Sequence, residues 1–237
     1  EESRYYLILA RDLDDGDVLV RVKYSAVARR DALACTGREA LVRRFPCVGG
    51  SDLLGEVIAS AAPRFRPGDE VLATGYGLGV NHHGGFAERA LLPGGWLLPR
   101  PAELADWECM ALGSAGLAVA MAISRLENNG LKREMGPVLV SGATGGVGSL
   151  AVVLLATRGY EVVALTGRPG LAEWLKTLGA SRVMSNDELH PVETSRLSRK
   201  GVWAAAIDNC GGDVLGWILA SAKPGAGVVA MGSVAGD

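Results

Sequence analysis

A glycine-rich turn at residues 137–148 carries the clearest chemical signal in the sequence. A short apolar run leads into Gly142, Gly145 and Gly148 at a G-x-x-G-x-x-G spacing, and an apolar, helix-forming stretch follows. Such glycines let the backbone turn sharply and let a pyrophosphate come close, while the helix start offers N–H groups and a partial positive charge. A turn without a ligand is the alternative, but the flanking strand and helix favour a dinucleotide. The expected contacts are Ser141, Gly142, Ala143, Thr144, Gly145, Gly146, Val147 and Gly148.

The residues after the next apolar run indicate which dinucleotide is bound. Units that select NAD usually place Asp or Glu here, hydrogen-bonded to the ribose hydroxyls. This chain reads Thr166-Gly167-Arg168 instead, so a hydroxyl and a guanidinium are available for a 2′-phosphate and no carboxylate repels it. Thr166 and Arg168 therefore predict NADP(H), with a solvated Arg168 as the alternative. Asn209 follows a later apolar run, where open α/β sheets bind ligands, and we expect backbone contact with the cofactor there.

The hydrophobic patterning changes character along the chain. The first hundred residues are rich in short strand patterns, whereas apolar runs alternate with amphipathic stretches later, as in βαβ units with a parallel sheet. We expect strands at 18–24, 56–60 and 70–74, a loop at 76–85, and a helix at 102–125 interrupted at 113–116. The later strands are expected at 137–141, 161–165, 202–207 and 227–231, with helices at 147–157, 171–178 and 214–222. The boundary is placed near residue 112.

Composition narrows the function classes. With 49% hydrophobic and 21% charged residues and a net charge of −2, the chain has the balance of a globular protein with a core, and neither a nucleic-acid footprint nor a basic membrane face is expected. Four cysteines without a CxxC pair are typical of thiols in a reducing compartment. No signal peptide is recognised, and no apolar run reaches the roughly 20 residues that span a bilayer. We expect a cytoplasmic protein without a membrane partner.

Further stretches carry a family resemblance. They are DALACTG at 31–37, GSDLLG at 50–55, PGDEVLATG at 67–75, NHHGG at 81–85, GSAG at 113–116, SGATGGVGS at 141–149, TGR at 166–168, WLKTLGA at 174–180 and WAAAID at 203–208. In this order they resemble the zinc-independent medium-chain dehydrogenases/reductases, and within that superfamily the acryloyl-CoA reductase (AcuI/YhdH/YhfP) family, long labelled quinone oxidoreductases.

The resemblance implies an α/β fold with a GroES-like β domain at 1–112 and a Rossmann domain with a doubly wound parallel sheet at 113–237. The C-terminal part of the family fold has no counterpart in this sequence. In the family the nicotinamide lies in the cleft between the domains. The implied reaction is NADPH-dependent reduction of an activated C=C bond, typically in acryloyl-CoA. Hydride goes to the β-carbon, and the thioester enolate is protonated at the α-carbon. A homodimer is also implied.

The resemblance also supplies the remaining site residues. The catalytic candidates are Arg30, Tyr76, Asn81 and His82, and the further cofactor contacts are Ser114, Gly232 and Ser233. Tyr76 could donate to the substrate carbonyl or pack as an aromatic ring. His82 could bind substrate, relay a proton or anchor its glycine-rich loop. Zinc-dependent relatives carry Cys near Asp31 and Gly-His-Glu where this chain has Gly50-Ser51-Asp52, so no metal is expected.

Two departures from the family bear on the substrate. The family's Asn-Tyr-Lys-Asp is Ala28-Arg29-Arg30-Asp31 here, and a family threonine is Ala118. Arg30 keeps the positive charge of the lysine, but an amide and two hydroxyls are lost. The leading expectation is a reductase of an α,β-unsaturated acyl-CoA. The alternatives are a quinone or enone reductase and an NADP(H)-binding scaffold with impaired catalysis.

Overall fold

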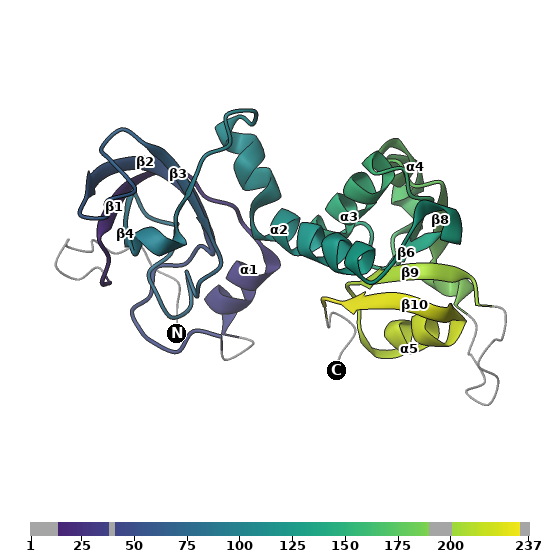
Figure 1. Cartoon of the computed structure of the whole chain (residues 1–237). Coiled ribbons are helices and arrows are strands. Elements are labelled where there is room, and N and C mark those ends of the chain that lie inside the picture. The colour runs from purple at the N-terminus through teal and green to yellow at the C-terminus, as the bar shows by residue number, and fades with distance from the viewer. Residues whose placement is uncertain (1–13, 38–40, 190–200, 233–237) are drawn as a thin grey trace. The chain divides into compact units, whose positions relative to one another are not determined.

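The computed structural model describes residues 14–37, 41–189 and 201–232 of the chain. The chain divides into two compact units, Glu1–Ser114 and Ala115–Asp237 (Figure 1). The expected domain boundary near residue 112 lies close to this division. Because each unit has its own sheet and its own core, each is described by itself.

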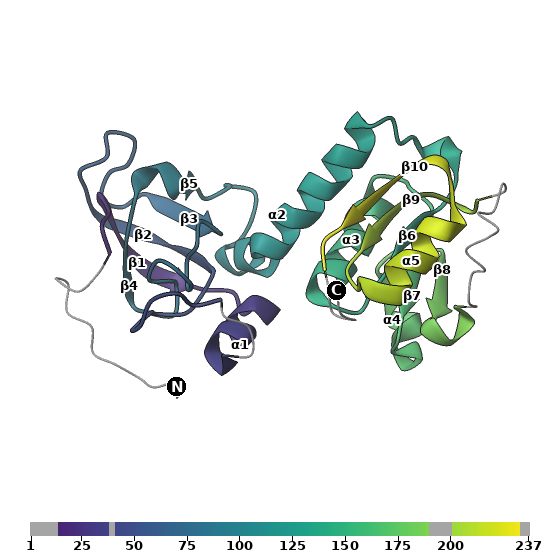
Figure 2. The same ribbon diagram turned by 90° about the horizontal axis from the view of Figure 1, so that it is seen from below.

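The first unit is built on an antiparallel sheet in the order β4-β1-β2-β3-β5 (Figure 2). The alternating pattern of the first strand places Val18 and Val20 in the core and leaves Arg21 exposed, as a half-buried strand requires. Leu53, Val57 and other apolar side chains complete this core. The elements are β1 (Val18–Tyr24), α1 (Arg29–Thr36), β2 (Asp52–Ser60), β3 (Glu70–Thr74), β4 (Arg89–Leu92), a 3₁₀ turn (Gly94–Trp96) and β5 (Leu98–Pro99).

The second unit contains a parallel sheet in the order β10-β9-β6-β7-β8. Its elements are β6 (Val138–Val140), α3 (Gly146–Thr157), β7 (Val162–Thr166), α4 (Ala172–Thr177), β8 (Arg182–Ser185), β9 (Trp203–Asp208), α5 (Gly212–Ser221) and β10 (Ala222–Ala230). The described part of this unit also has 3₁₀ turns before β6, before α4 and after β8, at Arg133–Met135, Pro169–Leu171 and Asn186–Glu188. The expected α/β class, with an antiparallel sheet followed by a Rossmann-like parallel sheet, is confirmed.

Helices cover both faces of the parallel sheet, which is why its strands are apolar on both sides. Val138 and Val140 point toward α3 and the later part of α2 (Asp106–Asn128), whereas Leu139 lies in a separate cluster with Ile218 of α5. Figures 1 and 2 show α3 and α5 on opposite faces. Burying one such aliphatic side chain contributes about 1.5–3 kcal/mol. This packing holds the carboxyl ends of the strands in a fixed array.

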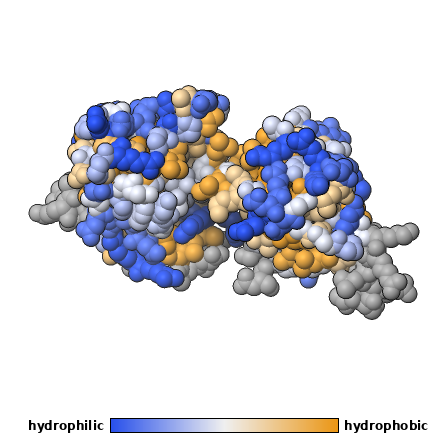
Figure 3. All heavy atoms as spheres, in the orientation of Figure 1, coloured by the Kyte–Doolittle hydropathy of each residue, from blue (hydrophilic) through white to orange (hydrophobic). Residues whose placement is uncertain are grey.

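Helix α2 is long and apolar enough, by length and composition alone, to cross a membrane. Its most apolar 18-residue window has a mean hydropathy of 1.6, and charged residues near both ends of the helix keep the uncharged run at 109–124 shorter than the roughly 20 residues that span a bilayer. The helix is broken at Gly113, and its later apolar residues Val119 and Ile123 are fully buried in the core of the second unit. Hydrophilic side chains cover much of the visible face of each unit, with apolar patches between them (Figure 3). Core packing therefore accounts for the buried apolar residues of α2, whereas Trp107, Leu117 and Met121 on the same helix are exposed.

Candidate functional site

The carboxyl ends of β6 and β9 form the point at which the strand order of the parallel sheet reverses. From β6 the chain continues outward to β7 and β8, and then returns to add β9 and β10 on the other side of β6. Open α/β sheets bind ligands in the crevice at such a switch point. Ser141, which follows β6, and Asp208, which ends β9, lie here and are hydrogen-bonded to each other. The sequence-predicted glycine turn begins at the same point.

The glycine turn is folded tightly enough to need its glycines. Gly142 has φ of 56°, in the left-handed region that glycine adopts without strain. The N–H of Gly145 donates to the carbonyl oxygen of Gly142 at 2.9 Å. A Cβ on Gly148 would lie 2.3 Å from that same carbonyl oxygen, so only glycine permits α3 to approach the turn. Ala143 is fully buried and donates to Leu165, which fastens the turn to β7.

The start of α3 has the features of an anion-binding site. Its N-cap is Gly145, which offers no side chain to the N–H groups of the first turn. Those groups lack intrahelical partners and carry the positive end of the helix dipole. Gly145 and Gly146 are exposed, and a Cβ on Gly146 would meet no atom within 4 Å. Open space in front of N–H donors fits the pyrophosphate of a dinucleotide.

The end of β7 places polar side chains beside this turn. Thr166 is buried, and its hydroxyl lies 3.1 Å from the hydroxyl of Thr144 in the turn. The same Thr166 oxygen accepts the backbone N–H of Arg168 at 3.0 Å, which fixes the bend after the strand. Arg168 is exposed, and its guanidinium makes no ion pair with any residue that the structure describes. It is therefore available to a phosphate group.

The residues after β9 and β10 continue the same edge of the sheet. The side-chain amide of Asn209 donates to the carbonyl oxygen of Ser141 at 2.8 Å. A Cβ on Gly232 would lie 2.3 Å from the carbonyl oxygen of Asn209, so the two backbones are in close contact. Burial raises the pKa of the Cys210 thiol, against a lowering by its hydrogen bond with Ser141. This favours backbone contacts over thiol chemistry. Ser233 lies outside the described residues.

Asp208 is a site residue that sequence reasoning missed. It is fully buried, and its carboxylate accepts hydrogen bonds from Ser141, Cys210 and Gly211. In the sequence it is only the last residue of an apolar run. An acidic residue at the end of a strand that opens onto a switch point was the available signal.

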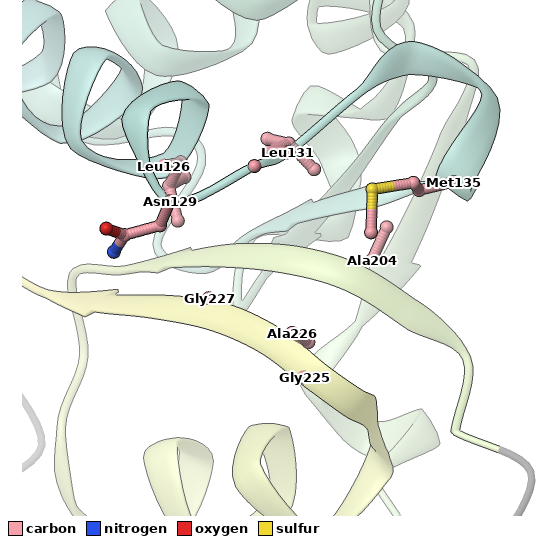
Figure 4. A pocket seen from close by; sticks show the side chains of 9 residues that line it. Leu126, Asn129, Leu131, Met135, Ala204, Gly225, Ala226 and Gly227 are labelled. Carbon is pink, nitrogen blue, oxygen red and sulfur yellow. The ribbon is translucent and has the colours of Figure 1, made fainter.

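A separate pocket of about 180 Å³ lies elsewhere in the second unit (Figure 4). Leu126, Leu131, Met135 and Ala204 line it, together with glycines of β10. Ala204 is near the start of β9, whereas the glycine turn meets the end of that strand. The pocket is thus at the opposite end of the strands from the glycine turn. It is separate from the predicted nucleotide contacts.

In the first unit, the loop between β3 and β4 gathers three of the catalytic candidates. The N–H groups of Asn81 and His82 both donate to the carbonyl oxygen of Gly77, which closes the loop tightly. Tyr76 has φ of 52°, which is unusual for a bulky residue, and its ring stacks on Trp96 with centroids 5.2 Å apart. His82 contacts the same indole edge-on at 5.0 Å. Tyr76 and Asn81 are exposed.

The imidazole of His82 is engaged by neighbouring groups. Nδ1 lies 2.9 Å from the carbonyl oxygen of His83 and 3.3 Å from a carboxylate oxygen of Asp14, and Nε2 lies 3.4 Å from the carbonyl oxygen of Asp15. Burial would raise the pKa of Asp14, but the His83 N–H, Arg44 and His82 lower it overall. In this structure His82 therefore anchors its loop, which is one of the roles expected for it beside substrate binding and proton relay.

Arg30 lies in the first turn of α1 and is exposed. The neighbouring Asp31 is buried and organises this segment. Its carboxylate accepts from the N–H groups of Ala28 at 2.8 Å and Ser51 at 3.0 Å, which ties α1 to the start of β2. Within the described residues, no hydrogen bond or ion pair joins Arg30 to the loop that carries Tyr76 and Asn81.

Ser114, a predicted cofactor contact, is engaged within the first unit. Its hydroxyl donates to Asp52 at 2.9 Å, beside the break of α2 at Gly113. The other carboxylate oxygen of Asp52 is buried without a hydrogen-bond partner within the described part of the chain. Burial raises the pKa of Asp52, and the charge of Asp31 raises it further, against lowering by Ser114 and Arg30.

Replacing the carboxylate by an amide should have opposite effects on stability at Asp52 and at Asp31. A carboxyl whose pKa is raised in the folded state stabilises the fold below its unfolded pKa and loses that contribution as pH rises through its folded pKa. Asp52→Asn cannot ionise and keeps an acceptor for Ser114, so at pH 7 its free energy of unfolding should equal or exceed that of the wild type. Asp31→Asn, the matched control, loses charge-assisted bonds and should be destabilised by about 2 kcal/mol. Denaturant titrations test this, and equal destabilisation by both changes would contradict it.

Among the described residues, no group of three or more His, Cys, Asp or Glu side chains is arranged to hold a metal ion.

Comparisons with known proteins place this geometry in a family. Residues 14–102 match the model of the alcohol dehydrogenase GroES-like domain. The probable acrylyl-CoA reductase AcuI of Escherichia coli is 45% identical, over 94% of this chain and 68% of its own length. The structure of Escherichia coli YhdH with bound NADPH is 43% identical, with a TM-score of 0.93 over 98% of this chain and 71% of that one.

A third relative comes from Bacillus subtilis. The putative quinone oxidoreductase YhfP is 44% identical, over 97% of this chain and 69% of its own length. A crystal structure of yhfP with NAD bound has a TM-score of 0.89 at 43% identity, over 97% of this chain and 70% of that one. On these similarities, the chain belongs to the AcuI/YhdH/YhfP family of quinone oxidoreductase-like medium-chain dehydrogenases/reductases.

Proposed function

We propose that this protein is an NADPH-dependent reductase of an activated C=C bond, with an α,β-unsaturated acyl-CoA such as acryloyl-CoA as substrate. The observation that carries the proposal is that two candidate phosphate-binding features lie side by side at the ends of β6 and β7. There an uncapped glycine turn lies beside Thr166 and an arginine without an ion-pair partner in the described residues. The name of the Escherichia coli relative AcuI and the NADPH-bound YhdH structure support it.

The chain's own groups would hold the dinucleotide in three places. The N–H groups at the start of α3 bind the pyrophosphate, and Thr166 with Arg168 binds the 2′-phosphate. The backbone of Asn209 and Gly232 would lie along the nicotinamide half of the dinucleotide. When bound, the nicotinamide supplies a hydride. The protein has to hold the nicotinamide and the β-carbon of the substrate at a distance and orientation that allow hydride transfer.

The acceptor chemistry requires a hydrogen-bond donor at the thioester oxygen. Hydride addition at the β-carbon leaves an enolate, which a donor stabilises before protonation at the α-carbon. Asn81 is our first candidate, because it is exposed and its amide has no hydrogen bond among the described residues, whereas His82 is engaged. Arg30 and Tyr76 are the further candidates.

Asn81→Ala should therefore slow turnover more than it weakens the fold. Loss of one hydrogen bond to the developing enolate oxygen, which carries negative charge, should lower kcat roughly 10- to 100-fold, while the thermal midpoint stays near that of the wild type. Steady-state NADPH consumption with acryloyl-CoA measures the first quantity and thermal unfolding the second. Unchanged kcat would remove Asn81 from the reaction.

A turnover comparison tests the proposal against its alternatives. Purified protein is supplied with NADPH and, separately, with acryloyl-CoA, a simple enone and a quinone. We expect acryloyl-CoA to be reduced with the highest kcat/KM. Preference for the quinone would favour the second candidate, which the name of the YhfP relative supports. NADPH binding without turnover of any acceptor would favour the scaffold.

The proposal includes a cytoplasmic location, where NADPH and acyl-CoA thioesters meet, and a homodimer. Light scattering of the purified protein tests the second point, because a mass of one chain would exclude the dimer.

A further inference from the structure

We propose that Asp208 is the positioning residue for the nicotinamide half of the cofactor site, an inference that rests on the proposed function. The predicted 2′-phosphate contacts, Thr166 and Arg168, lie at the end of β7 and just after it, and the pyrophosphate turn follows β6. In the sheet order, β9 and β10 come next on the far side of β6. A dinucleotide that crosses the switch point must therefore place its other half over the ends of β9 and β10. Asp208 ends β9.

The carboxylate of Asp208 joins the segments that surround this half of the site. One oxygen accepts from the hydroxyl of Ser141 at 2.5 Å and from the N–H of Cys210 at 3.2 Å. The other accepts from the N–H of Gly211 at 2.8 Å. The backbone oxygen of Asp208 accepts from the N–H of Met231 at 2.7 Å, just after β10. A single buried residue thus fastens the ends of β6, β9 and β10 together.

The loop after β9 depends on these bonds for its shape. Gly211 and Gly212 both have positive φ, at 73° and 52°, so the backbone reverses sharply where α5 begins. Between the carboxylate and this reversal, the N–H of Asn209 donates to the Ser141 hydroxyl at 2.9 Å. Ser141 therefore donates to Asp208 and accepts from Asn209. This relay fixes the backbone that lines the nicotinamide half.

An amide cannot replace the carboxylate here. Three donors converge on two side-chain oxygens, and asparagine would turn an NH₂ group toward at least one of them. A buried donor left without an acceptor destabilises the conformation it had in the wild type. The loop after β9 should therefore relax, while the glycine turn and Thr166 with Arg168 keep their own hydrogen bonds.

Two ligands separate this role from general support of the fold. NADPH occupies both halves of the site, whereas 2′,5′-ADP occupies only the adenosine half. We expect Asp208→Asn to weaken NADPH binding at least about tenfold and to change 2′,5′-ADP binding less than about twofold. Nicotinamide fluorescence and calorimetry measure the two affinities on the full chain.

Ser141→Ala is the second variant, because it removes one donor to Asp208 and the acceptor of the Asn209 N–H, while the carboxylate keeps its bonds from Cys210 and Gly211. Ser141→Ala should also weaken NADPH binding more than 2′,5′-ADP binding, but by a smaller factor than Asp208→Asn. It keeps the proposal testable if Asp208→Asn does not fold. Parallel loss of both ligands in the folded variants, or unchanged NADPH affinity, would overturn the proposal. Failure of the wild type to bind either ligand would instead remove the proposed function itself.

Discussion

Gly148→Ala is expected to abolish tight NADPH binding and to destabilise the second unit. The added methyl group would lie 2.3 Å from the carbonyl oxygen of Gly142 and 2.8 Å from the Cα of Ala143. Both atoms belong to the backbone of the turn, so the turn must open or α3 must move away. We expect NADPH affinity to fall more than about a hundredfold, because the N–H groups at the start of α3 would no longer point together toward the phosphates. The free energy of unfolding should fall by about 1–3 kcal/mol.

Gly146→Ala is the matched control in the same helix start. Its methyl group would meet no atom within 4 Å, and alanine favours the helix more than glycine does. Its thermal unfolding should therefore resemble that of the wild type, and its NADPH affinity should fall far less than that of Gly148→Ala. Equal losses in the two variants would show that the close approach at Gly148 does not shape the site.

Arg168→Ala should remove the preference for NADPH over NADH. Arg168 lies two residues after Thr166, the last residue of β7, and its guanidinium has no ion-pair partner in the described residues, so a 2′-phosphate would be its main ligand. A charge-assisted bond of this kind contributes about 1.5–3 kcal/mol, or roughly 10- to 100-fold in affinity. NADPH should weaken by that factor and NADH should not change. Fluorescence titration with each nucleotide gives both constants.

Arg182→Ala is the control for a general loss of positive charge. Arg182 lies at the start of β8 and is exposed, at 3.5 Å from Glu188. Its removal should leave the ratio of the two affinities unchanged. If the wild type binds NADPH and NADH equally, or if Arg168→Ala weakens both alike, the assignment of the 2′-phosphate contact is wrong. The NAD-bound structure of the YhfP relative makes this comparison informative.

The glycine turn could be predicted because its geometry is local. Gly142 and Gly145 lie between β6 and α3, and Gly148 lies in the first turn of α3. The positive φ of Gly142 and the close approach at Gly148 both require glycine. The polar residues at the end of β7 were found for the same reason, since the four strand residues before Thr166 are all apolar. Both signals lie within a few residues of the chemistry that they support.

Elements whose stability comes from distant residues were missed or misplaced. Helix α1 is short and polar, and the buried hydrogen bond of Asp31 with Ser51 holds it in place. Strand β2 begins before the expected residue 56 because Gly55, which interrupts the pattern, lets β1 approach the backbone closely. Strand β10 contains Pro224, which the sequence pattern placed outside a strand but which an edge strand tolerates.

The network around Asp208 could not be predicted from the sequence. Ser141 and Asp208 are 67 residues apart, and only the sheet order brings their strands together. The same holds for the hydrogen bond from Ser114 to Asp52, which lies 62 residues earlier in the chain. Hydrophobic periodicity predicts which residues face the core, but it does not predict which buried polar groups pair there.

Transfer of deuterium from labelled NADPH tests the central claim most directly. The wild-type protein is incubated with acryloyl-CoA and NADPH that carries deuterium at the transferable position, and the thioester product is examined by mass spectrometry and NMR. The account predicts propionyl-CoA with one deuterium at the β-carbon and a solvent-derived hydrogen at the α-carbon. A product without deuterium at the β-carbon, or no product while NADPH remains bound, would contradict it.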